Sequence, residues 1–235
     1  MELSLPMPGA AVYKFKESLS QAEFLERPNR FLSLVRQGER VRQCHLHDPG
    51  RLEELTPGSV VLVREVTGIK TSCSVVAFMS SAGWVPVDSR IHSEVASLFL
   101  PGARREVSVG KSRLDFAYEG GYVEVKGCTL VRDGRGLFPD SPTRRGRKHL
   151  EELIRIRQSG QEAGLLFLVL REDATCLAPN EGTDPLFAAA LQVALLAGVQ
   201  VWALKFAFRP PSLVYLKRIP LCANRPLCDR RHSKT

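Results

Sequence analysis

The chain has 235 residues, enough for one large domain or two small ones with a sizeable core. Its 44% hydrophobic and 25% charged residues are typical of an ordinary soluble globular protein. The formal net charge of +8 is uneven, because residues 1–86 carry +1, residues 87–216 carry +2 and residues 217–235 carry +5. Most of the excess lies in this basic tail, which either contacts phosphates or is simply solvated, so charge alone does not identify a nucleic-acid-binding protein.

The cysteines and the N-terminus bear on the cellular compartment. Six cysteines lie scattered along the chain, and the opening MELSLPMPGA lacks the basic and long apolar regions of a secretory signal. We therefore expect reduced thiols in a cytoplasmic protein. A zinc site of Cys222, Cys228 and His232 is disfavoured, because its spacing fits no common site and a fourth ligand is missing.

The first 86 residues are rich in short strands. Four stretches combine β-branched residues with partial alternation, namely RFLSLVR, RVRQCHL, SVVLVREV and TSCSVVAFM. The turns HDPGR and TPGS lie between them, with a helical turn expected at 51–55. Several short strands in so few residues indicate a small β-barrel, for which the OB-fold is one candidate, although strand count does not distinguish it from other small barrels.

From Asp88 onwards helices alternate with strands, which indicates a mixed α/β domain over residues 87–216. The expected elements, in chain order, are a helix at 90–100, strands at 105–109, 112–118 and 122–131, a helix at 142–158, the strand GLLFLVL, a helix at 185–197 and a strand at 199–207.

One apolar segment, which begins at Asp184, has the composition of a membrane span. Asp184-Pro185, however, is typical of an N-cap and a first helical residue, and Gly198 of a helix stop. The VQVWALKFAF that follows is predicted to be a strand with Lys205 in its interior. A helix and a buried strand explain the segment without a bilayer, which needs ~20 uninterrupted apolar residues, so we expect no membrane partner.

The stretch SRLDFAYEGGYVEVKG, residues 112–127, is a predicted hairpin. Its Gly-Gly pair accepts the positive φ angles of a tight turn. A turn centred there pairs Ala117 with Glu124 and Asp115 with Lys126, so Asp115, Glu124 and Lys126 project from one face. The opposite, apolar face consists of Leu114, Phe116, Tyr118, Val123 and Val125.

Two carboxylates that converge from neighbouring strands repel each other unless a cation lies between them. Asp115 and Glu124 are therefore candidate ligands of Mg²⁺ or Mn²⁺, which prefer oxygen donors. Lys126 would then orient water or stabilise charge that develops on a phosphate. The alternative is a structural Asp115–Lys126 pair with Glu124 solvated, and the bare pattern favours it because such a pattern is common by chance.

The helix that follows Ser141-Pro142 is strongly basic in its first turns. Its apolar face predicts an outward basic set of Arg144, Arg145 and Lys148, with Arg147 beside them as a further nucleic-acid-binding candidate. Cations near a helix N-terminus oppose the helix dipole by roughly 0.3–1 kcal/mol each, which makes sense where an anion binds. A solvated basic face is an equally open alternative.

Several stretches occur in a characteristic order: HLHDPGRL, SRLDF, YVEVKGCTLV, FPDSPTRRGRKHLEEL and DPLF…GVQVWAL. In order and spacing they resemble the sugar fermentation stimulation protein A family over residues 24–207. The resemblance implies a mixed α+β fold, with an OB-like barrel in residues 1–86 and a domain of the PD-(D/E)XK nuclease type in residues 87–216. It also implies DNA binding with little sequence preference, and a role in regulating sugar-catabolism genes.

The family pattern also implies a catalytic set. By position, Asp115 matches the first motif acid, Glu124 and Lys126 match the E-x-K element, and Glu94 matches an acid in the first helix, although helix geometry alone favours a surface role for Glu94. In such nucleases the acids hold Mg²⁺ and the lysine helps to activate the attacking water. The catalytic prediction is therefore these four residues, with Asp115 and Glu124 as metal ligands.

The chain departs from the family pattern at three positions. Gly127 replaces the usual serine, Asp48 stands where asparagine is common, and Arg144 replaces a usual glutamate. None of these changes touches the two acids and the lysine.

Three functions stay open at the level of sequence: a metal-dependent phosphodiesterase acting on DNA or RNA, a DNA-binding protein that cleaves nothing, and an architectural module. The intact acids and lysine favour the first, although a fold does not prove a reaction. The barrel candidates for nucleic-acid contact are Arg30, Arg36, Arg42 and Arg51. Its strand aromatics are Phe24, Phe31 and Phe78, most of which we expect in the core.

Overall fold

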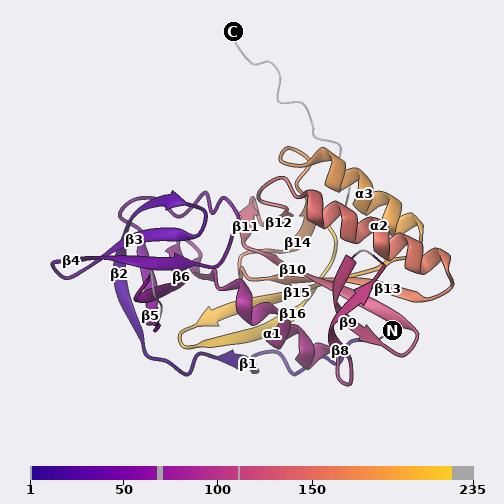
Figure 1. Cartoon of the computed structure of the whole chain (residues 1–235), viewed down its shortest axis with the longest axis horizontal. Coiled ribbons are helices and arrows are strands. Elements are labelled where there is room, and N and C mark those ends of the chain that lie inside the picture. Colours follow the sequence, from indigo (N-terminus) through magenta and orange to yellow (C-terminus); the bar gives the residue numbers. More distant parts are fainter. Residues whose placement is uncertain (1, 68–70, 111, 224–235) are drawn as a thin grey trace, which may run out of the picture.

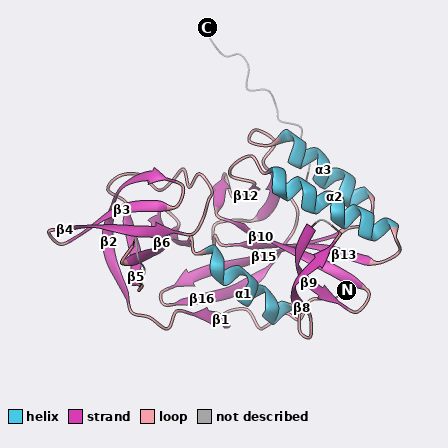
Figure 2. Ribbon diagram, viewed as in Figure 1, coloured by secondary structure: helices cyan, strands magenta, loops and turns pink. Residues whose placement is uncertain are grey.

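The computed structural model describes residues 2–67, 71–110 and 112–223 of the chain. A small β-barrel lies beside a larger mixed α/β unit, in which helices cover both faces of a sheet (Figure 1). All three α-helices of the described residues belong to the larger unit, whereas the barrel consists of strands and loops (Figure 2). The predicted fold class, an OB-like barrel followed by an α/β domain, is confirmed.

Five strands of a six-stranded sheet close the barrel, and the sixth strand, β7, pairs with β6. The strand order is β4-β3-β2-β5-β6-β7, and an additional parallel pairing of β4 with β6 completes the ring. The strands are β2 (Leu19–Asn29), β3 (Leu32–Gln37), β4 (Arg40–Leu46), β5 (Val60–Glu65), β6 (Cys73–Ser80) and β7 (Gly83–Pro86). Alternate side chains point inward, so that Cys44 and Leu46 of β4 share a core with Phe24 and Phe78. We did not predict β2 or β7.

Two disulfides correct the expectation of reduced thiols. Cys44 lies opposite Cys73 in the β4–β6 pairing, with the two Cα atoms 4.5 Å apart. Cys176 is bonded to Cys222, with a Cα–Cα distance of 5.0 Å. Sequence spacing missed both because the partners are 29 and 46 residues apart and meet only through strand packing. Cys128 is a buried free thiol.

The larger unit is built on a seven-stranded sheet in the order β1-β16-β15-β13-β10-β9-β8. Its central strands β10, β13 and β15 are parallel. The strands are β1 (Ala11–Lys14), β8 (Arg104–Val109), β9 (Ser112–Tyr118), β10 (Gly121–Cys128), β13 (Glu162–Val169), β15 (Gln200–Arg209) and β16 (Ser212–Ile219). β1 joins this sheet by pairing with β16, although we had grouped residues 1–86 with the barrel, and β16 was not predicted.

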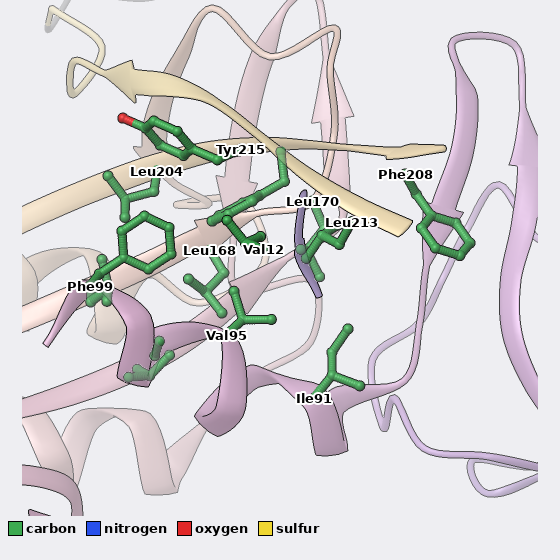
Figure 3. Close-up of a cluster of buried hydrophobic side chains, with 14 of the residues drawn as sticks. Val12, Ile91, Val95, Phe99, Leu168, Leu170, Leu204, Phe208, Leu213 and Tyr215 are labelled. Carbon is green, nitrogen blue, oxygen red and sulfur yellow. The ribbon is translucent and has the colours of Figure 1, made fainter. Parts of the chain in front are cut away.

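Helices cover the two faces of this sheet. The short helix η1 (Ser89–Ile91) leads into α1 (His92–Phe99) on one face, and α2 (Arg144–Gln158) and α3 (Pro185–Leu196) pack on the other (Figures 1 and 2). On the α1 side, Val95 and Phe99 lie in one buried cluster with Leu204 and Tyr215 (Figure 3). Because both faces are covered, β13 is buried along nearly its whole length.

The helix ends follow local capping chemistry. Asp184 accepts a 2.9 Å hydrogen bond from the Phe187 backbone N–H, and Gly198 follows the end of α3 with a φ of +84°, as predicted. α2 begins at Arg144 rather than at Pro142, because Thr143 is its N-cap. No helix in the described ranges is both long and apolar enough to cross a membrane.

A small third sheet is joined to the C-terminal end of the described residues by a bridge between Leu177 and Leu221. It consists of β11 (Leu130–Arg132), β12 (Arg135–Phe138) and β14 (Cys176–Pro179). The predicted strand at 122–131 is therefore divided between β10 and β11. Of the expected basic tail, residues 217–219 belong to β16 and Cys222 is held in a disulfide. The zinc candidates Cys228 and His232 lie outside the described residues.

Candidate functional site

The β9–β10 hairpin has a different register from the predicted one. Tyr118 pairs with Gly121 and Ala117 pairs with Tyr122, so the turn is Glu119-Gly120 and the predicted pairing of Ala117 with Glu124 is wrong. Gly121 is needed for close packing, because a Cβ there would meet the Tyr118 hydroxyl at 2.5 Å. The register differs by two residues, which is the period of a strand, so Phe116, Val123 and Val125 still share one face as predicted.

Asp115 separates the two strands of this hairpin. The β9–β10 pairing ends at Val123 and Phe116, and beyond it the Asp115 Oδ2 accepts a 2.7 Å hydrogen bond from the Val125 backbone N–H. The predicted pair of Asp115 with Lys126 is therefore not formed. Leu114, which we placed with Phe116, packs instead in the cluster on the α2 side of the sheet. The carboxylate thus replaces a strand–strand hydrogen bond and is fixed in position.

Glu124 lies at the centre of a cluster of polar side chains. Its Oε1 accepts hydrogen bonds from the Lys126 amine and from Nδ1 of His149 on α2. The Lys126 Nζ and the His149 Nδ1 are 3.4 Å apart. Sequence reasoning missed His149, although its position on the inward face of α2, one residue before Leu150, was a usable signal.

The two carboxyl groups have different electrostatic surroundings. Burial raises the pKa of Asp115, and the Glu124 charge raises it further. Burial also raises the pKa of Glu124, but the hydrogen bond from His149 and the Lys126 charge outweigh it and hold that pKa below its ordinary value. The surroundings thus favour the charged form of Glu124 more strongly than that of Asp115.

One carboxylate oxygen of Glu124 accepts no hydrogen bond from the described residues. The Oε2 atom is buried and has no hydrogen-bond partner among the described residues, while Oε1 takes both the lysine and the histidine. A buried carboxylate oxygen without a partner is costly, and a cation is the ligand that best satisfies it. The described ranges hold no group of three or more His, Cys, Asp or Glu side chains arranged for a metal. Any ion here would therefore take its protein ligands from Asp115 and Glu124.

Helix α2 brings its basic side chains to the same region. The Arg145 Nε lies 3.4 Å from the Nε2 of His149, and Arg144, Arg145 and Lys148 are exposed. Arg147 differs, because it forms a 3.0 Å ion pair with the Asp184 carboxylate at the start of α3. Three of the four predicted α2 cations are therefore exposed, although Arg145 also donates to His149, and the fourth joins two helices.

Glu94 is not brought to this cluster. It is exposed on α1, which covers the opposite face of the sheet, and its charge contributes to the raised pKa of Tyr13 on β1 after the larger effect of burial. Its neighbour in sequence, His92, packs against Gly127, where a Cβ would overlap the imidazole Cε1. The close approach of the His92 ring therefore explains why this chain has glycine at position 127.

The barrel arginines fall into two groups. Arg36 forms a 3.2 Å ion pair with Glu23, and Arg42 binds both oxygens of Glu65 at 2.6 and 2.7 Å. The exposed Arg30 and Arg51 form no side-chain ion pair within the described residues. Of the three aromatics, Phe24 and Phe78 are core residues, whereas Phe31 is 48% exposed.

A cavity of about 240 Å³ lies between the barrel and the α/β unit. Residues that line it include Asp48 and Gly50 from the barrel and Lys126, Asp140 and Thr143 from the larger unit. Burial, with the nearby charge of Asp140, raises the pKa of Asp48 to about 6. Lys126 therefore lines the same cavity as two residues with carboxyl groups, Asp48 and Asp140.

Comparison with known proteins identifies the family. A model described as the sugar fermentation stimulation protein RE domain matches residues 87–212, and one described as the SfsA N-terminal OB domain matches residues 25–87. The chain belongs to the SfsA family. The resemblance that the sequence indicated is confirmed, and the two matched ranges correspond to the α/β unit and to the barrel.

Individual members of the SfsA family match nearly the whole chain. A sugar fermentation stimulation protein homolog of Saccharolobus solfataricus is 47% identical over 217 residues, which cover 91% of this chain and 90% of that protein. A homolog of Sulfurisphaera tokodaii is 49% identical over 214 residues, covering 90% and 93%. The solved structure of Pyrococcus furiosus SfsA in complex with Ca²⁺ has a TM-score of 0.84 and 28% identity, and the match covers 91% of this chain and 100% of that one.

Proposed function

We propose that this protein binds DNA with little sequence preference and cleaves its phosphodiester bonds with the help of Mg²⁺ or Mn²⁺. The observation that carries the proposal is the buried Glu124 Oε2, which lacks a partner among the described residues and lies on an ionised carboxylate beside Asp115. Such an atom fits a cation better than it fits a closed structural ion pair. We also propose a cytoplasmic location, where DNA is the available substrate.

The two carboxylates fit a hard divalent ion. Mg²⁺ is usually held by one or two carboxylates, with water and substrate phosphates completing its octahedron. Asp115 and Glu124 match that ligand set, and the absence of a third acidic ligand in the described ranges suits an ion that shares its coordination with substrate. The Pyrococcus furiosus relative was solved with Ca²⁺, an ion with the same preference for oxygen. When bound, the ion would supply positive charge to the phosphate oxygens.

Lys126 would act on the nucleophile. In the structure its amine donates to Glu124 Oε1, an oxygen that it shares with His149. Lys126 also lines the cavity that a substrate would enter. A lysine in that position would orient a water molecule toward the phosphate and stabilise the charge that develops there. His149 is a positioning residue, because it holds the Glu124 carboxylate from the helix side.

A binder without catalysis is the second candidate. Lys126 forms an ion pair with Glu124, and His149 hydrogen-bonds the same oxygen, without any metal. The described ranges contain no cluster of three metal-ligating side chains. A protein of this kind would grip DNA through α2 and leave it intact. The role in regulating sugar-catabolism genes that the family resemblance implies would be compatible with such binding alone.

The test is cleavage and binding of labelled single- and double-stranded DNA and RNA in Mg²⁺ or Mn²⁺. The Glu124→Gln variant keeps the size of the side chain but removes the charge, so cleavage should fall by several orders of magnitude while binding stays. Glu119→Gln, at the exposed turn of the same hairpin, is the matched control and should cleave normally. Binding without cleavage in any metal favours the second candidate, and preference for RNA would change the substrate class.

A further inference from the structure

An aromatic row lies on the outside of the barrel at the end of β4. Phe31, 48% exposed, stacks on His45 with ring centroids 6.3 Å apart and an interplanar angle of 18°. The His45 ring in turn lies 4.1 Å from that of His47, at an angle of 39°. Cys44 and Leu46 point into the core between these residues, so His45 faces away from it. We call Phe31, His45 and His47 the ring row.

The ring row is not explained by packing of the barrel core. The core already holds Phe24 and Phe78, and exposing half of a phenylalanine adds no stability to it. Burial lowers the pKa of His47 to about 4, so that its ring is uncharged near neutral pH, and its Nε2 lies 3.0 Å from the Ser74 hydroxyl. Three rings with nearly parallel or tilted planes are suited to stacking with further flat groups.

The ring row leads directly to the candidate site. His47 is followed in sequence by Asp48, which lines the same cavity as Lys126. The Ser89 hydroxyl donates a 2.6 Å hydrogen bond to the His47 carbonyl, and Ser89 also lines this cavity. The backbone at the end of the ring row is thus fixed to the cavity wall.

Charged side chains surround the ring row and the cavity to which it leads. Asp48 and Asp140 line the cavity together with Lys126, so its wall carries both acidic and basic groups. Arg30, next to Phe31, is exposed without an ion-pair partner in the described ranges, and Arg145 and Lys148 are exposed on α2. A strand that lies along the ring row would therefore turn its bases toward the rings, and its phosphates toward the exposed basic side chains and Lys126.

We infer that Phe31, His45 and His47 form a stacking platform for the unpaired bases of single-stranded nucleic acid, which guides the strand into the cavity beside Lys126. The inference deepens the proposed function and rests on it, because it names the strand structure of the substrate. Stacking is indifferent to base identity, since every base has a π-face, and this agrees with binding of little sequence preference.

The experiment compares variants of the full chain by anisotropy of labelled oligo-dT, oligo-rU and duplex DNA, in EDTA so that nothing is cleaved. Phe31→Ala and His45→Ala should each weaken binding of both single strands by about 5- to 150-fold, the range expected from the loss of one stacked base. Duplex affinity should change by less than about twofold, because paired bases cannot reach the rings. Phe31→Tyr, which keeps a ring, should bind like the wild type.

Val41→Ala is the matched control, because Val41 is 59% exposed and precedes His45 on the same outward side of β4. It should leave single-strand binding unchanged. The slope of affinity against salt should also stay the same in Phe31→Ala, since no phosphate contact is lost.

The outcomes separate the two proposals. When Phe31→Ala binds single strands as tightly as the wild type while duplex DNA is bound or cut, the platform is wrong and the proposed function stands. Equal losses in Phe31→Ala and Val41→Ala would also overturn the platform, because they would reflect a general effect on the barrel. When the wild type binds neither single strands nor duplex, both proposals are wrong.

Discussion

The carboxylate of Asp115 accepts a 2.7 Å hydrogen bond from the backbone N–H of Val125, across the point where β9 and β10 separate. A side chain that was expected only to face a metal therefore also satisfies a backbone donor of the central sheet. The candidate site and the stability of the fold share this residue, and two substitutions can separate the two roles.

Asp115→Asn keeps an oxygen acceptor for the Val125 N–H but loses the charge. We expect its free energy of unfolding to stay close to that of the wild type, while its affinity for Mn²⁺ falls sharply. Asp115→Ala leaves the N–H unpaired and should lower the free energy of unfolding by about 1–3 kcal/mol. Urea denaturation and Mn²⁺ titration calorimetry measure the two effects. Unchanged Mn²⁺ binding in Asp115→Asn would remove Asp115 from the ligand set.

Lys126→Ala separates action on water from action on the ion. If the lysine orients the nucleophile, the variant should lose about 100- to 10,000-fold in cleavage rate, the range typical of a positioned proton-transfer group. It should still bind Mn²⁺, because the ion would contact the carboxylates and not the amine. Single-turnover cleavage and Mn²⁺ titration give the two numbers. Loss of Mn²⁺ binding together with cleavage would assign the lysine a structural role instead.

The raised pKa of the Asp48 carboxyl group predicts that the free energy of unfolding depends on pH. Its pKa is raised from 3.8 to about 6 by burial and by Asp140, so the folded protein takes up this proton more readily than the unfolded chain. The stabilisation is complete below about pH 4 and is lost as the pH rises through about 6. Above that pH, Asp48→Asn should unfold with a free energy about 1–3 kcal/mol higher than the wild type, and below about pH 4 the difference should vanish.

Urea denaturation at several pH values measures this difference. The amide introduced by Asp48→Asn keeps an oxygen for the 2.8 Å hydrogen bond that Asp48 accepts from the Gly50 N–H, so the loop geometry is preserved. Asp133→Asn, at an exposed position, is the control and should show no such pH dependence. A gain in Asp48→Asn that is the same at all pH values would contradict the electrostatic explanation.

We expect some basic residues of α2 to bind DNA and Arg147 to stabilise the fold. Replacing Arg144, Arg145 and Lys148 together by Ala should weaken duplex binding and reduce the slope of log affinity against log salt by up to about 2.7, the value for three phosphate contacts. Arg147→Ala should instead lower the melting temperature, because it breaks the ion pair with Asp184, and change the salt slope little. Salt titrations and thermal melts distinguish them. A salt slope that the triple variant leaves unchanged would place the DNA elsewhere.

The sequence by itself was sufficient for features that depend on a few neighbouring residues. Asp184-Pro185 and Gly198 marked the ends of α3 because capping chemistry acts within one helical turn. Asp115, Glu124 and Lys126 were placed on one face even though the hairpin register was wrong. The error was two residues, which equals the period of a strand and leaves the faces unchanged.

Tertiary structure decided which distant residues meet. His149 reaches Glu124 from a helix 25 residues later, and Cys44 reaches Cys73 only because β4 and β6 close the barrel. In the sequence, Arg147 cannot be distinguished from the other basic residues of α2. Its role depends on the packing of α3, which brings Asp184 into an ion pair with it. Helix caps and the alternation of side chains along a strand depend only on the backbone geometry of neighbouring residues. These contacts depend instead on how whole elements pack, and no short stretch of the chain contains that information.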